Sequence, residues 1–377
     1  MTIALLYGGK SGEHEISLIS ATAIARNIDT TEHQLKLVGI TKTGRWFLQD
    51  YGELARIKRD EKATLQIHED AAMEVSVVPA GGKKGAFKVG ANHIPVDVVI
   101  PALHGTFSED GTVQGLLEMA DVPYVGCGVL ASAVAMDKEK AKVLLENAGI
   151  PIVPYICIRR SDLMSSERYD ELLEEAQNKL GFPLFVKPCS AGSSDGASKA
   201  EDLRHLNGAI VEAFEWDDKI LIEKAINARE LECSVTGNPT TASGSHKVED
   251  TVVYGPGEIA PTHEFYDYDA KYNDPKGAKL VIPAKLDDVT RETIRNLAIQ
   301  AYKTIDASGL SRVDFFVDKD NGDIYLNEIN TFPGFTSISM FPKLCENEGL
   351  AFGELIDMLI KQAQFRFKAT RNLRTER

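Results

Sequence analysis

Several features that mark common protein classes are absent from this sequence. No apolar run approaches the roughly 18 residues of a membrane-spanning helix. The first residues, MTIALLYGGKSGEHE, lack the basic start and the small-residue cleavage site of a secretory signal peptide. The five cysteines lie far apart and include no Cys-x-x-Cys pair, which favours buried reduced thiols over disulfides or a structural zinc site. We therefore expect a cytoplasmic protein with no membrane partner.

Positive charge is also scarce. The chain has 42 Lys and Arg against 56 Asp and Glu, so its formal net charge is −14 at pH 7. This sign disfavours general binding to nucleic acid, but it is compatible with a local basic pocket for a phosphorylated ligand. With 377 residues, 43% of them hydrophobic, the chain is long enough for roughly two or three globular domains.

The first third of the chain predicts an open α/β sheet. Three nearly all-apolar runs, Ile3–Tyr7, Leu35–Ile40 and Val96–Leu103, are typical of parallel strands. The apolar period of Glu15–Asn27 predicts a helix. In such sheets, ligands bind at the carboxyl ends of the strands. Residues 50–94 are charge-rich and predict a surface insertion with a hairpin.

The rest of the chain alternates helices and strands. We expect helices at Ser132–Asn147, Tyr169–Leu180, Leu203–Phe214, Thr290–Ala307 and Gly353–Phe365, and strands at Leu184–Lys187, Ile220–Glu223 and Glu230–Thr236. Gly149 and Pro151, which follow the first of these helices, indicate a domain hinge. The aromatic-rich residues 250–280 have no clear period and predict an active-site lid.

Polar side chains interrupt a predicted hairpin near the C-terminus. The stretch SRVDFFVDKDNGDIYLNEIN places Asp314 on one strand and Glu328 and Asn330 on the next, where residues two apart point to the same face. Three oxygen donors without His or Cys favour Mg²⁺ or Mn²⁺, which also binds substrate phosphates. A solvated edge hairpin with a salt bridge to Arg312 is the alternative, but the apolar flanking residues favour the metal site.

Two further segments carry groups suited to phosphate and nucleotide. FVKPCSAGSSDG delivers Lys187 from a strand into a loop of small residues that can approach a phosphate, although the Walker A order is absent. LIEKAINARELE places Glu223 and Lys224 at the end of one strand and Glu230 at the start of another. A nucleotide site and a plain charged turn are both compatible with this second pattern.

The N-terminal strands also end in polar groups. YGGKSGEHEIS is not the dinucleotide fingerprint, and its two carboxylates stand at a helix N-terminus, where they are favoured as caps. We expect Glu13 to be such a cap, whereas Glu15 could point toward a cationic ligand group. LHGTFSEDGTVQG places His104 just after an apolar strand, and AMDKEKAK places Lys138 on a helix. A structural histidine and a solvated lysine are the alternatives.

In this order along the chain, the motifs together resemble the D-alanine–D-alanine ligases of bacterial cell-wall synthesis, which are members of the ATP-grasp superfamily. The resemblance rests on YGGKSGEHEISL, LHGTFSEDGTVQG, MDKEKAK, FVKPCSAGSSDG, LIEKAINARELE, EFYDYDAKY and RVDFF with LNEINTFPGFTSISMFP. Each motif is weak alone, but the joint match is specific and covers nearly the whole chain.

The resemblance implies a three-domain ATP-grasp architecture of mixed α/β and α+β class. The N-terminal α/β domain would span residues 1–130. A central subdomain (131–245) and a C-terminal subdomain (246–377), with the lid near 250–280, would enclose ATP. The resemblance also implies that the enzyme is a homodimer.

Individual residues receive roles from the same resemblance. Asp314, Glu328 and Asn330 would hold two Mg²⁺ (or Mn²⁺) ions. ATP would be bound by Lys138, Lys187, Glu223, Lys224, Ile226, Glu230 and, from the lid, Phe265 and Lys271. The substrates would be handled by Glu15 at the ammonium of the first D-alanine, linked through Ser193 to Tyr272, by His104 nearby, by Arg312 and Gly334 at the oxyanion, and by Ser339 at the carboxylate of the second.

The implied reaction joins two D-alanine molecules through an acyl phosphate made from ATP. Ala191 and Asp195 depart from the family pattern, because many relatives have Glu and an apolar residue there, so D-lactate and D-serine remain rival second substrates. Tyr272 is typical of the dipeptide ligases. A nucleotide-binding regulator without catalysis is the alternative from another class, and the intact metal and oxyanion positions disfavour it.

Overall fold

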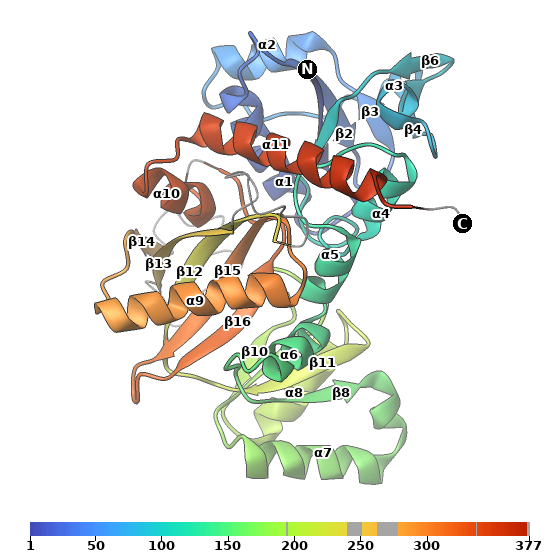
Figure 1. Ribbon diagram of the computed structural model, residues 1–377. Coiled ribbons are helices and arrows are strands. Elements are labelled where there is room, and N and C mark those ends of the chain that lie inside the picture. The colour runs from blue at the N-terminus through green and yellow to red at the C-terminus, as the bar shows by residue number, and fades with distance from the viewer. Residues whose placement is uncertain (194, 240–250, 262–277, 337, 375–377) are drawn as a thin grey trace.

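The computed structural model describes residues 1–193, 195–239, 251–261, 278–336 and 338–374. Figure 1 shows a blue N-terminal lobe at the top, a green-to-yellow central lobe at the bottom and an orange C-terminal lobe between them. The red final helix runs across the N-terminal lobe. Three residues with predicted roles, Phe265, Lys271 and Tyr272, lie outside the described residues.

The N-terminal lobe is built on a four-stranded sheet. Its strands, in order across the sheet, are β3 (Trp46–Leu48), β2 (Gln34–Ile40), β1 (Thr2–Gly8) and β7 (Val98–Pro101). β1 runs parallel to β2 and β7, and α1 (His14–Asn27) packs against it. α4 (Thr112–Met119) follows β7. The predicted strands and helix are thus confirmed, and the carboxyl ends of β1 and β7 lie side by side.

The charge-rich insertion packs on the N-terminal sheet and adds a small three-stranded sheet. It contains α2 (Tyr51–Arg59), the 3₁₀ turn Ala71–Met73, β4 (Val75–Val77), α3 (Gly82–Gly85), β5 (Phe87–Val89) and β6 (Asn92–Ile94). The three strands pair antiparallel, so the predicted hairpin is extended by one strand. Ile67 packs onto the main sheet so closely that a Cβ on Gly8 or Gly39 would lie 2.7 or 2.8 Å from it.

The predicted helix Ser132–Asn147 is wrong in one respect, because the structure breaks it at Asp137. α5 (Val129–Met136) ends there and α6 (Lys138–Asn147) begins. Asp137 has an extended backbone, and its side chain accepts a hydrogen bond from the Lys140 N–H. An aspartate that caps a helix in this way favours a new start over continuation, although the apolar period runs through both helices.

The central lobe is a four-stranded antiparallel sheet with its own core. In order across the sheet, the strands are β10 (Ser198–Ala200), β9 (Leu184–Pro188), β11 (Lys219–Lys224) and β8 (Tyr155–Arg159). The turn Arg160–Met164 follows β8, and α7 (Ser166–Lys179) and α8 (Leu203–Ala213) contribute apolar side chains to the core. The core of this lobe is separate from those of the other two lobes.

The C-terminal lobe contains a five-stranded antiparallel sheet. Its strands, in order, are β14 (Ala278–Val281), β13 (Val252–Pro261), β12 (Ala228–Gly237), β15 (Gly309–Asp318) and β16 (Ile324–Asn330), with α9 (Asp288–Thr304) packed on them. Because β12 pairs with β13 and β15, it belongs to this sheet. The predicted boundary after residue 245 is therefore too late, since a strand's partners cannot be read from its own residues.

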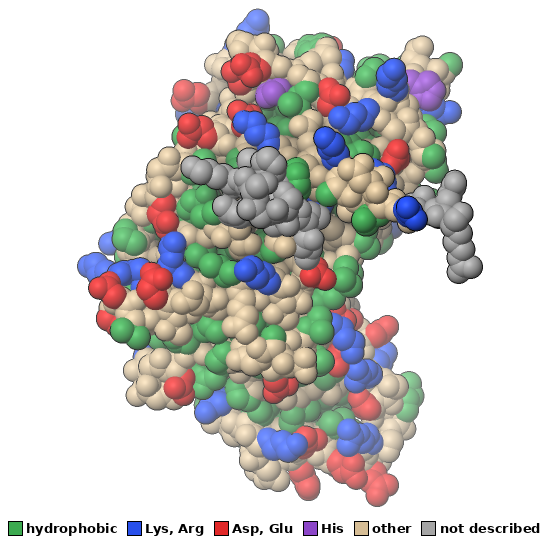
Figure 2. Space-filling view, in the orientation of Figure 1, with side chains coloured by type: hydrophobic (Ala, Val, Ile, Leu, Met, Phe, Trp, Pro, Cys, Tyr) green, Lys and Arg blue, Asp and Glu red, His purple; other side chains and the backbone are tan. Residues whose placement is uncertain are grey.

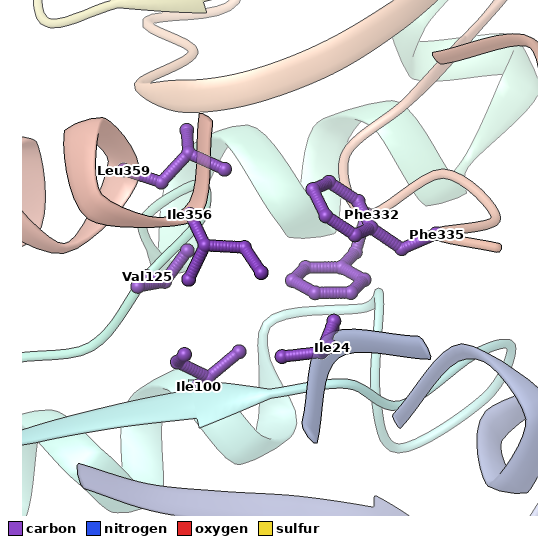
Figure 3. A pocket seen from close by; sticks show the side chains of 7 residues that line it. All are labelled: Ile24, Ile100, Val125, Phe332, Phe335, Ile356 and Leu359. Carbon is purple, nitrogen blue, oxygen red and sulfur yellow. The ribbon is translucent and has the colours of Figure 1, made fainter. Parts of the chain in front are cut away.

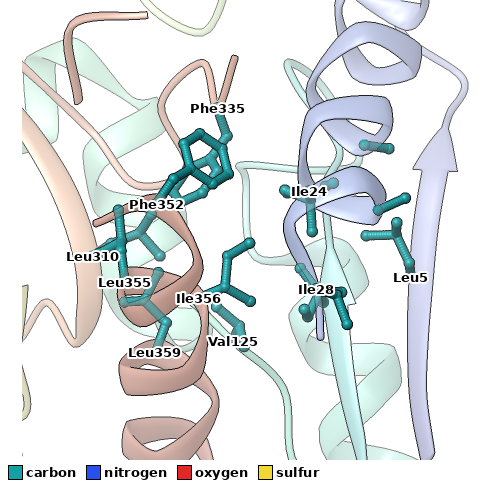
Figure 4. Close-up of a cluster of buried hydrophobic side chains, with 14 of the residues drawn as sticks. Leu5, Ile24, Ile28, Val125, Leu310, Phe335, Phe352, Leu355, Ile356 and Leu359 are labelled. Carbon is teal, nitrogen blue, oxygen red and sulfur yellow. The ribbon is translucent and has the colours of Figure 1, made fainter. Parts of the chain in front are cut away.

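The N-terminal and C-terminal lobes share one hydrophobic core. α10 (Met340–Asn347) and α11 (Phe352–Arg371) carry much of the C-terminal side of this core. Figure 4 shows Leu355 and Ile356 of α11 opposite Ile24 of α1 and Ile28, which directly follows α1. A cavity of about 10 Å³ remains in this core, at the lower limit of the roughly 10–15 Å³ that one water molecule needs. It is lined by Ile24, Ile100, Val125, Phe332, Phe335, Ile356 and Leu359 (Figure 3). These two lobes therefore form one packed body.

The surface carries side chains of both charges, and the five described cysteines form no disulfides. Acidic and basic side chains are interspersed on the face shown in Figure 2. All five cysteines are free; four are buried and Cys157 is half-buried. Among the residues that the structure describes, no helix has the length and apolar character needed to cross a membrane.

Candidate active site

The hairpin of β15 and β16 brings the predicted metal ligands together. Asp314 stands opposite Glu328, and Arg312 opposite Asn330. The Asn330 amide donates a hydrogen bond to Asp314 Oδ2 at 3.0 Å. The register shifts directly after Asp314, as in a β-bulge, which is a common way to aim side chains next to active sites. The sequence prediction that these oxygen donors share one face is confirmed by these contacts.

Arg312 compensates the negative charge of this hairpin. Its guanidinium donates hydrogen bonds of 2.8 and 2.7 Å to the two oxygens of Asp314. Its Nε also lies 3.2 Å from Glu232 Oε2. Burial would lower the pKa of Arg312, but Asp314 and Glu232 raise it well above its ordinary value. Arg312 is thus a permanent cation at the centre of the site.

The donor set fits a hard divalent cation that is shared with a ligand. Within the described ranges, no group of three His, Cys, Asp or Glu side chains is placed to hold a metal. Asp314 and Glu328 provide two carboxylates and Asn330 an amide oxygen. Mg²⁺ keeps several waters and is commonly held by one or two carboxylates together with substrate phosphates. The hairpin can therefore hold such an ion only as part of a larger shell.

Two lysines reach the hairpin from the central lobe. Lys187 is at the end of β9, and its Nζ donates to Asn327 Oδ1 at 3.2 Å. Lys138 begins α6, and its Nζ donates to the carbonyl oxygen of Ala191 at 2.7 Å. Burial lowers the pKa of Lys138, although Glu328 opposes this shift. Cationic groups and carboxylates thus face one another between the central and C-terminal sheets.

Glu223 is buried between two lysines, whereas the sequence was also compatible with a plain charged turn. This β11 residue is buried, with 2% of its surface exposed. Its Oε2 lies 2.8 Å from Lys187 Nζ, and its Oε1 lies 2.8 Å from Lys142 Nζ. Burial would raise the pKa of Glu223, but the two ammonium groups outweigh it and lower the pKa. Sequence reasoning missed Lys142, because a third lysine in DKEKAK resembles one more solvated charge.

The other predicted nucleotide residues line the crossover from β11 to β12. Lys224 is exposed, and Ile226 and Glu230 are half-buried. The Lys224 N–H donates to the Pro154 carbonyl oxygen at 3.1 Å, which fixes the strand end. Glu230 lies opposite Phe316 and Ile259 in the C-terminal sheet. This crossover joins the two sheets and lies directly beside the Glu223 cluster.

The structure does not place Glu15 against Ser193, to which the prediction linked it. Glu15 is 59% exposed, and its carboxylate pairs with Lys42 Nζ at 2.8 Å. Ser193 donates a hydrogen bond to Glu13 instead. Glu13 precedes the first residue of α1 and faces the loop of Gly192, where a Cβ would lie 3.1 Å from Glu13 Oε2. Side chains two apart at a helix start point in different directions, so only one of the two carboxylates can face the site.

His104 lies beside this carboxylate in the interior. Only 3% of its surface is exposed. Its ring nitrogens contact Ser20 Oγ at 2.8 Å and the Phe332 carbonyl oxygen at 3.1 Å. Burial would lower the pKa of His104, but Glu109, whose Oε1 lies 3.5 Å away, and Glu13 raise it. Glu109 was also missed, since its link to His104 depends on a loop that the sequence does not define.

Gly334 and Ser339 lie next to each other after β16. A Cβ on Gly334 would lie 3.1 Å from Ser339 Oγ. Ser339 Oγ lies 2.7 Å from Thr336 Oγ1 and accepts from the Thr336 N–H at 3.1 Å. Phe335, between them in the chain, donates its N–H to Ser20 Oγ at 3.3 Å. Since Ser20 also contacts His104, this loop is tied to the Glu13 side of the site.

Comparison with known proteins gives one consistent result. Family models described as "D-ala D-ala ligase N-terminus" and "D-ala D-ala ligase C-terminus" match residues 2–127 and 144–361. The chain is 53% identical over 375 residues to the D-alanine–D-alanine ligase of Treponema denticola, covering 100% of this chain and 99% of the relative. It is 46% identical over 366 residues to that of Caldicellulosiruptor bescii, covering 96% and 95%.

Solved structures agree with the sequence relatives. The structure of the D-alanine–D-alanine ligase from Coxiella burnetii aligns with a TM-score of 0.81 at 32% identity, covering 98% of this chain and 96% of that one. The VanG D-Ala:D-Ser ligase from Enterococcus faecalis aligns with a TM-score of 0.79 at 35% identity, covering 96% and 99%.

The fold and the site together define an ATP-grasp enzyme. Two antiparallel sheets meet around paired lysines and hard oxygen donors, as ATP-dependent ligation with a divalent metal requires. The chain belongs to the D-alanine–D-alanine ligase family.

Proposed function

We propose that this enzyme joins two D-alanine molecules with ATP, giving D-alanyl-D-alanine, ADP and phosphate for peptidoglycan synthesis. The names of its full-length relatives support this substrate pair. The structural observation that carries the proposal is the 3.2 Å contact of Lys187 with Asn327, which is the neighbour of Glu328. Phosphoryl transfer needs cations and oxygen donors at one place, and this contact joins them.

In the first step, the carboxylate of one D-alanine attacks the γ-phosphate of ATP. An acyl phosphate forms, and ADP is the leaving group. Lys138 and Lys187 bind the phosphates. Asp314, Glu328 and Asn330 would hold two Mg²⁺ ions, which offset charge on the transferring phosphoryl group. The remaining contacts with ATP come from Glu223, Lys224 and Ile226 at adenine, Glu230 at ribose, and Phe265 and Lys271.

In the second step, the amine of the other D-alanine attacks the acyl carbon, and phosphate leaves. The developing oxyanion is stabilised by Arg312 and by the N–H of Gly334. The pKa of Arg312 is raised by its carboxylate neighbours, so its charge persists through the reaction. Ser339 holds the carboxylate of the second substrate. It lies close to Gly334, since a Cβ on Gly334 would lie 3.1 Å from Ser339 Oγ.

The ammonium of the first D-alanine is held by Glu13, in place of the predicted Glu15. The hydrogen bond that Glu13 accepts from Ser193 supports this assignment, as does its influence on the raised pKa of His104. By its resemblance to the family, Tyr272 would complete the link from Ser193. His104 lies next to the first substrate. A half-buried carboxylate that can bind a cation is favoured over one already paired in solvent.

D-serine is the rival second substrate. The VanG D-Ala:D-Ser ligase aligns over 96% of this chain, so the fold alone does not separate the two activities. The departures at Ala191 and Asp195 lie in the loop of Ser193. Asp195 Oδ2 would lie 3.7 Å from a Cβ on Gly12, so its side chain reaches the Glu13 loop.

The test is a coupled assay of ADP release by the purified enzyme with Mg²⁺ and ATP. D-alanine alone should support turnover, and the product should have the mass of the dipeptide. D-alanine is then mixed with an equal concentration of D-serine or of D-lactate at neutral pH. Faster formation of a mixed product than of the dipeptide would overturn the choice of second substrate, and ATP binding without turnover would indicate a regulator.

We also propose a cytoplasmic homodimer. The five free thiols support a reducing compartment. Large apolar side chains on neighbouring helices α4 and α5 support an interface, since Met119 and Leu130 are 66% and 62% exposed. Sedimentation of the wild type and of Met119→Lys/Leu130→Lys checks this, because the substituted chain should be a monomer.

A further inference from the structure

Lys142 is a buried cation for which the reaction above has no use. It lies on α6, one turn after Lys138, and only 2% of its side chain is exposed. Its Nζ lies 2.8 Å from Glu223 Oε1, donates to the Val153 carbonyl oxygen at 3.1 Å, and lies 5.3 Å from the centre of the Tyr155 ring. Burial of a lysine is costly, so these contacts must compensate a substantial loss of hydration.

Glu223 connects Lys142 to the phosphate site. One carboxylate oxygen contacts Lys142, and the other lies 2.8 Å from Lys187 Nζ. Lys187 in turn donates to Asn327 at 3.2 Å, next to Glu328. A chain of polar contacts thus runs from α6 through β11 and β9 to the β16 strand.

The charge of this cluster decides what Lys187 can do. A carboxylate paired with Lys187 alone would cancel its charge at short range. With Lys142 on the other oxygen, the three side chains carry a formal charge of +1 when ionised. Screening by salt is weak in a buried site, so the added charge is felt by a nearby anion. Glu223 therefore holds the Lys187 side chain in place, and the net positive charge of the three side chains still attracts phosphate.

We propose that Lys142 is a positioning residue for the nucleotide. Its ammonium group pairs with one oxygen of Glu223, and the other oxygen orients Lys187. The positive charge of Lys142 offsets the negative charge of Glu223, so that Lys187 still attracts the ATP phosphates. This inference rests on the proposed function. A purely structural role, in which Lys142 only compensates buried Glu223, is the alternative.

Four variants separate the two roles. Lys142→Met removes the charge but keeps the length, and Glu223→Gln removes the carboxylate but keeps an oxygen that can accept from Lys187. The double variant combines them and leaves Lys187 as the one cation of the three positions. Lys140→Met is the matched control, because Lys140 lies on the same helix, is 55% exposed, and pairs with Glu139.

The measurements are the Kd of Mg²⁺–ATP by calorimetry, the KM of ATP and of D-alanine, and thermal unfolding. Lys142→Met should weaken ATP binding about tenfold or more, with little change in the KM of D-alanine. The double variant should bind ATP within about threefold of Glu223→Gln, because no carboxylate is then left to neutralise Lys187. Any loss of the adenine contact of Glu223 is the same in these two variants. Lys140→Met should match the wild type.

A double variant that binds ATP about tenfold more weakly than Glu223→Gln would overturn the proposal. This comparison stands even if Lys142→Met does not fold, since the double variant leaves no unpaired buried carboxylate. Unchanged ATP binding by folded Lys142→Met would overturn it too. Failure of the wild type to bind Mg²⁺–ATP would instead refute the proposed function, so the two failures are distinguishable.

Discussion

The hydroxyl of Ser193 donates a hydrogen bond to the carboxylate of Glu13, which is 180 residues earlier in the chain. This contact joins the loop after β9 in the central lobe to the start of α1 in the N-terminal lobe. The close approach needs Gly192, since a Cβ there would lie 3.1 Å from Glu13 Oε2. The contact therefore supports the proposal that Glu13 is the carboxylate that binds the first D-alanine.

Glu13→Gln should impair the use of D-alanine much more than Glu15→Gln. A hydrogen bond to a charged group contributes about 1.5–3 kcal/mol, so kcat/KM for D-alanine should fall roughly 10- to 150-fold. Glu15 is an exposed partner of Lys42, and such surface pairs contribute about 0–1 kcal/mol. Glu15→Gln should thus stay within about fivefold of wild type. Steady-state ADP release checks both, and a larger loss with Glu15→Gln would restore the original assignment.

Glu328→Gln should impair phosphoryl transfer and leave the fold intact. Loss of one group that stabilises charge in the transition state lowers kcat on the order of 10²–10³-fold. The Mg²⁺ concentration for half-maximal rate should rise as well. Asp323→Asn, in the exposed turn of the same hairpin, is the control and should behave as wild type. Near-normal turnover of Glu328→Gln at low Mg²⁺ would count against the metal assignment.

The stability that His104 contributes should depend on pH. Its pKa is raised above 6.5 in the folded state, so the folded protein holds the proton more tightly than the unfolded chain. This stabilisation is complete below about pH 6.5 and is lost as pH rises through the higher folded pKa. Urea unfolding of wild type and His104→Gln should therefore show a difference that shrinks with rising pH. A difference that is constant or grows would contradict the raised pKa.

Gly309→Ala should destabilise the junction of the N-terminal and C-terminal lobes. Gly309 has φ of +73°, and an added Cβ would lie 3.1 Å from the backbone of Gly126. Gly181→Ala is the matched control, with φ of +70° and nothing within 4 Å of the added Cβ. The backbone strain alone costs about 1–2 kcal/mol in both. The clash should add about 1–3 kcal/mol in Gly309→Ala, measured by urea unfolding. Equal losses would show that the junction can relax.

The sequence by itself determined the local elements and the chemistry of the hairpin. Strands such as β1 and helices such as α7 follow from apolar periods within a few residues, and they appear close to the predicted limits. Asp314, Glu328 and Asn330 were also predictable, because the pairing of a short hairpin follows from its turn and alternation. Such patterns depend on residues that are near one another in the chain.

Only the tertiary structure decided which groups meet across the lobes. It paired Glu13 with Ser193 and left Glu15 with Lys42, assigned β12 to the C-terminal sheet, and buried Lys142 against Glu223. Each of these outcomes depends on contacts between segments far apart in the sequence, where a charged residue has the same local pattern whether it faces solvent or a partner. The physical reason is that burial and ion pairing depend on packing. The apolar period of one segment indicates which of its faces is buried, but it does not indicate which residues of another lobe will pack there.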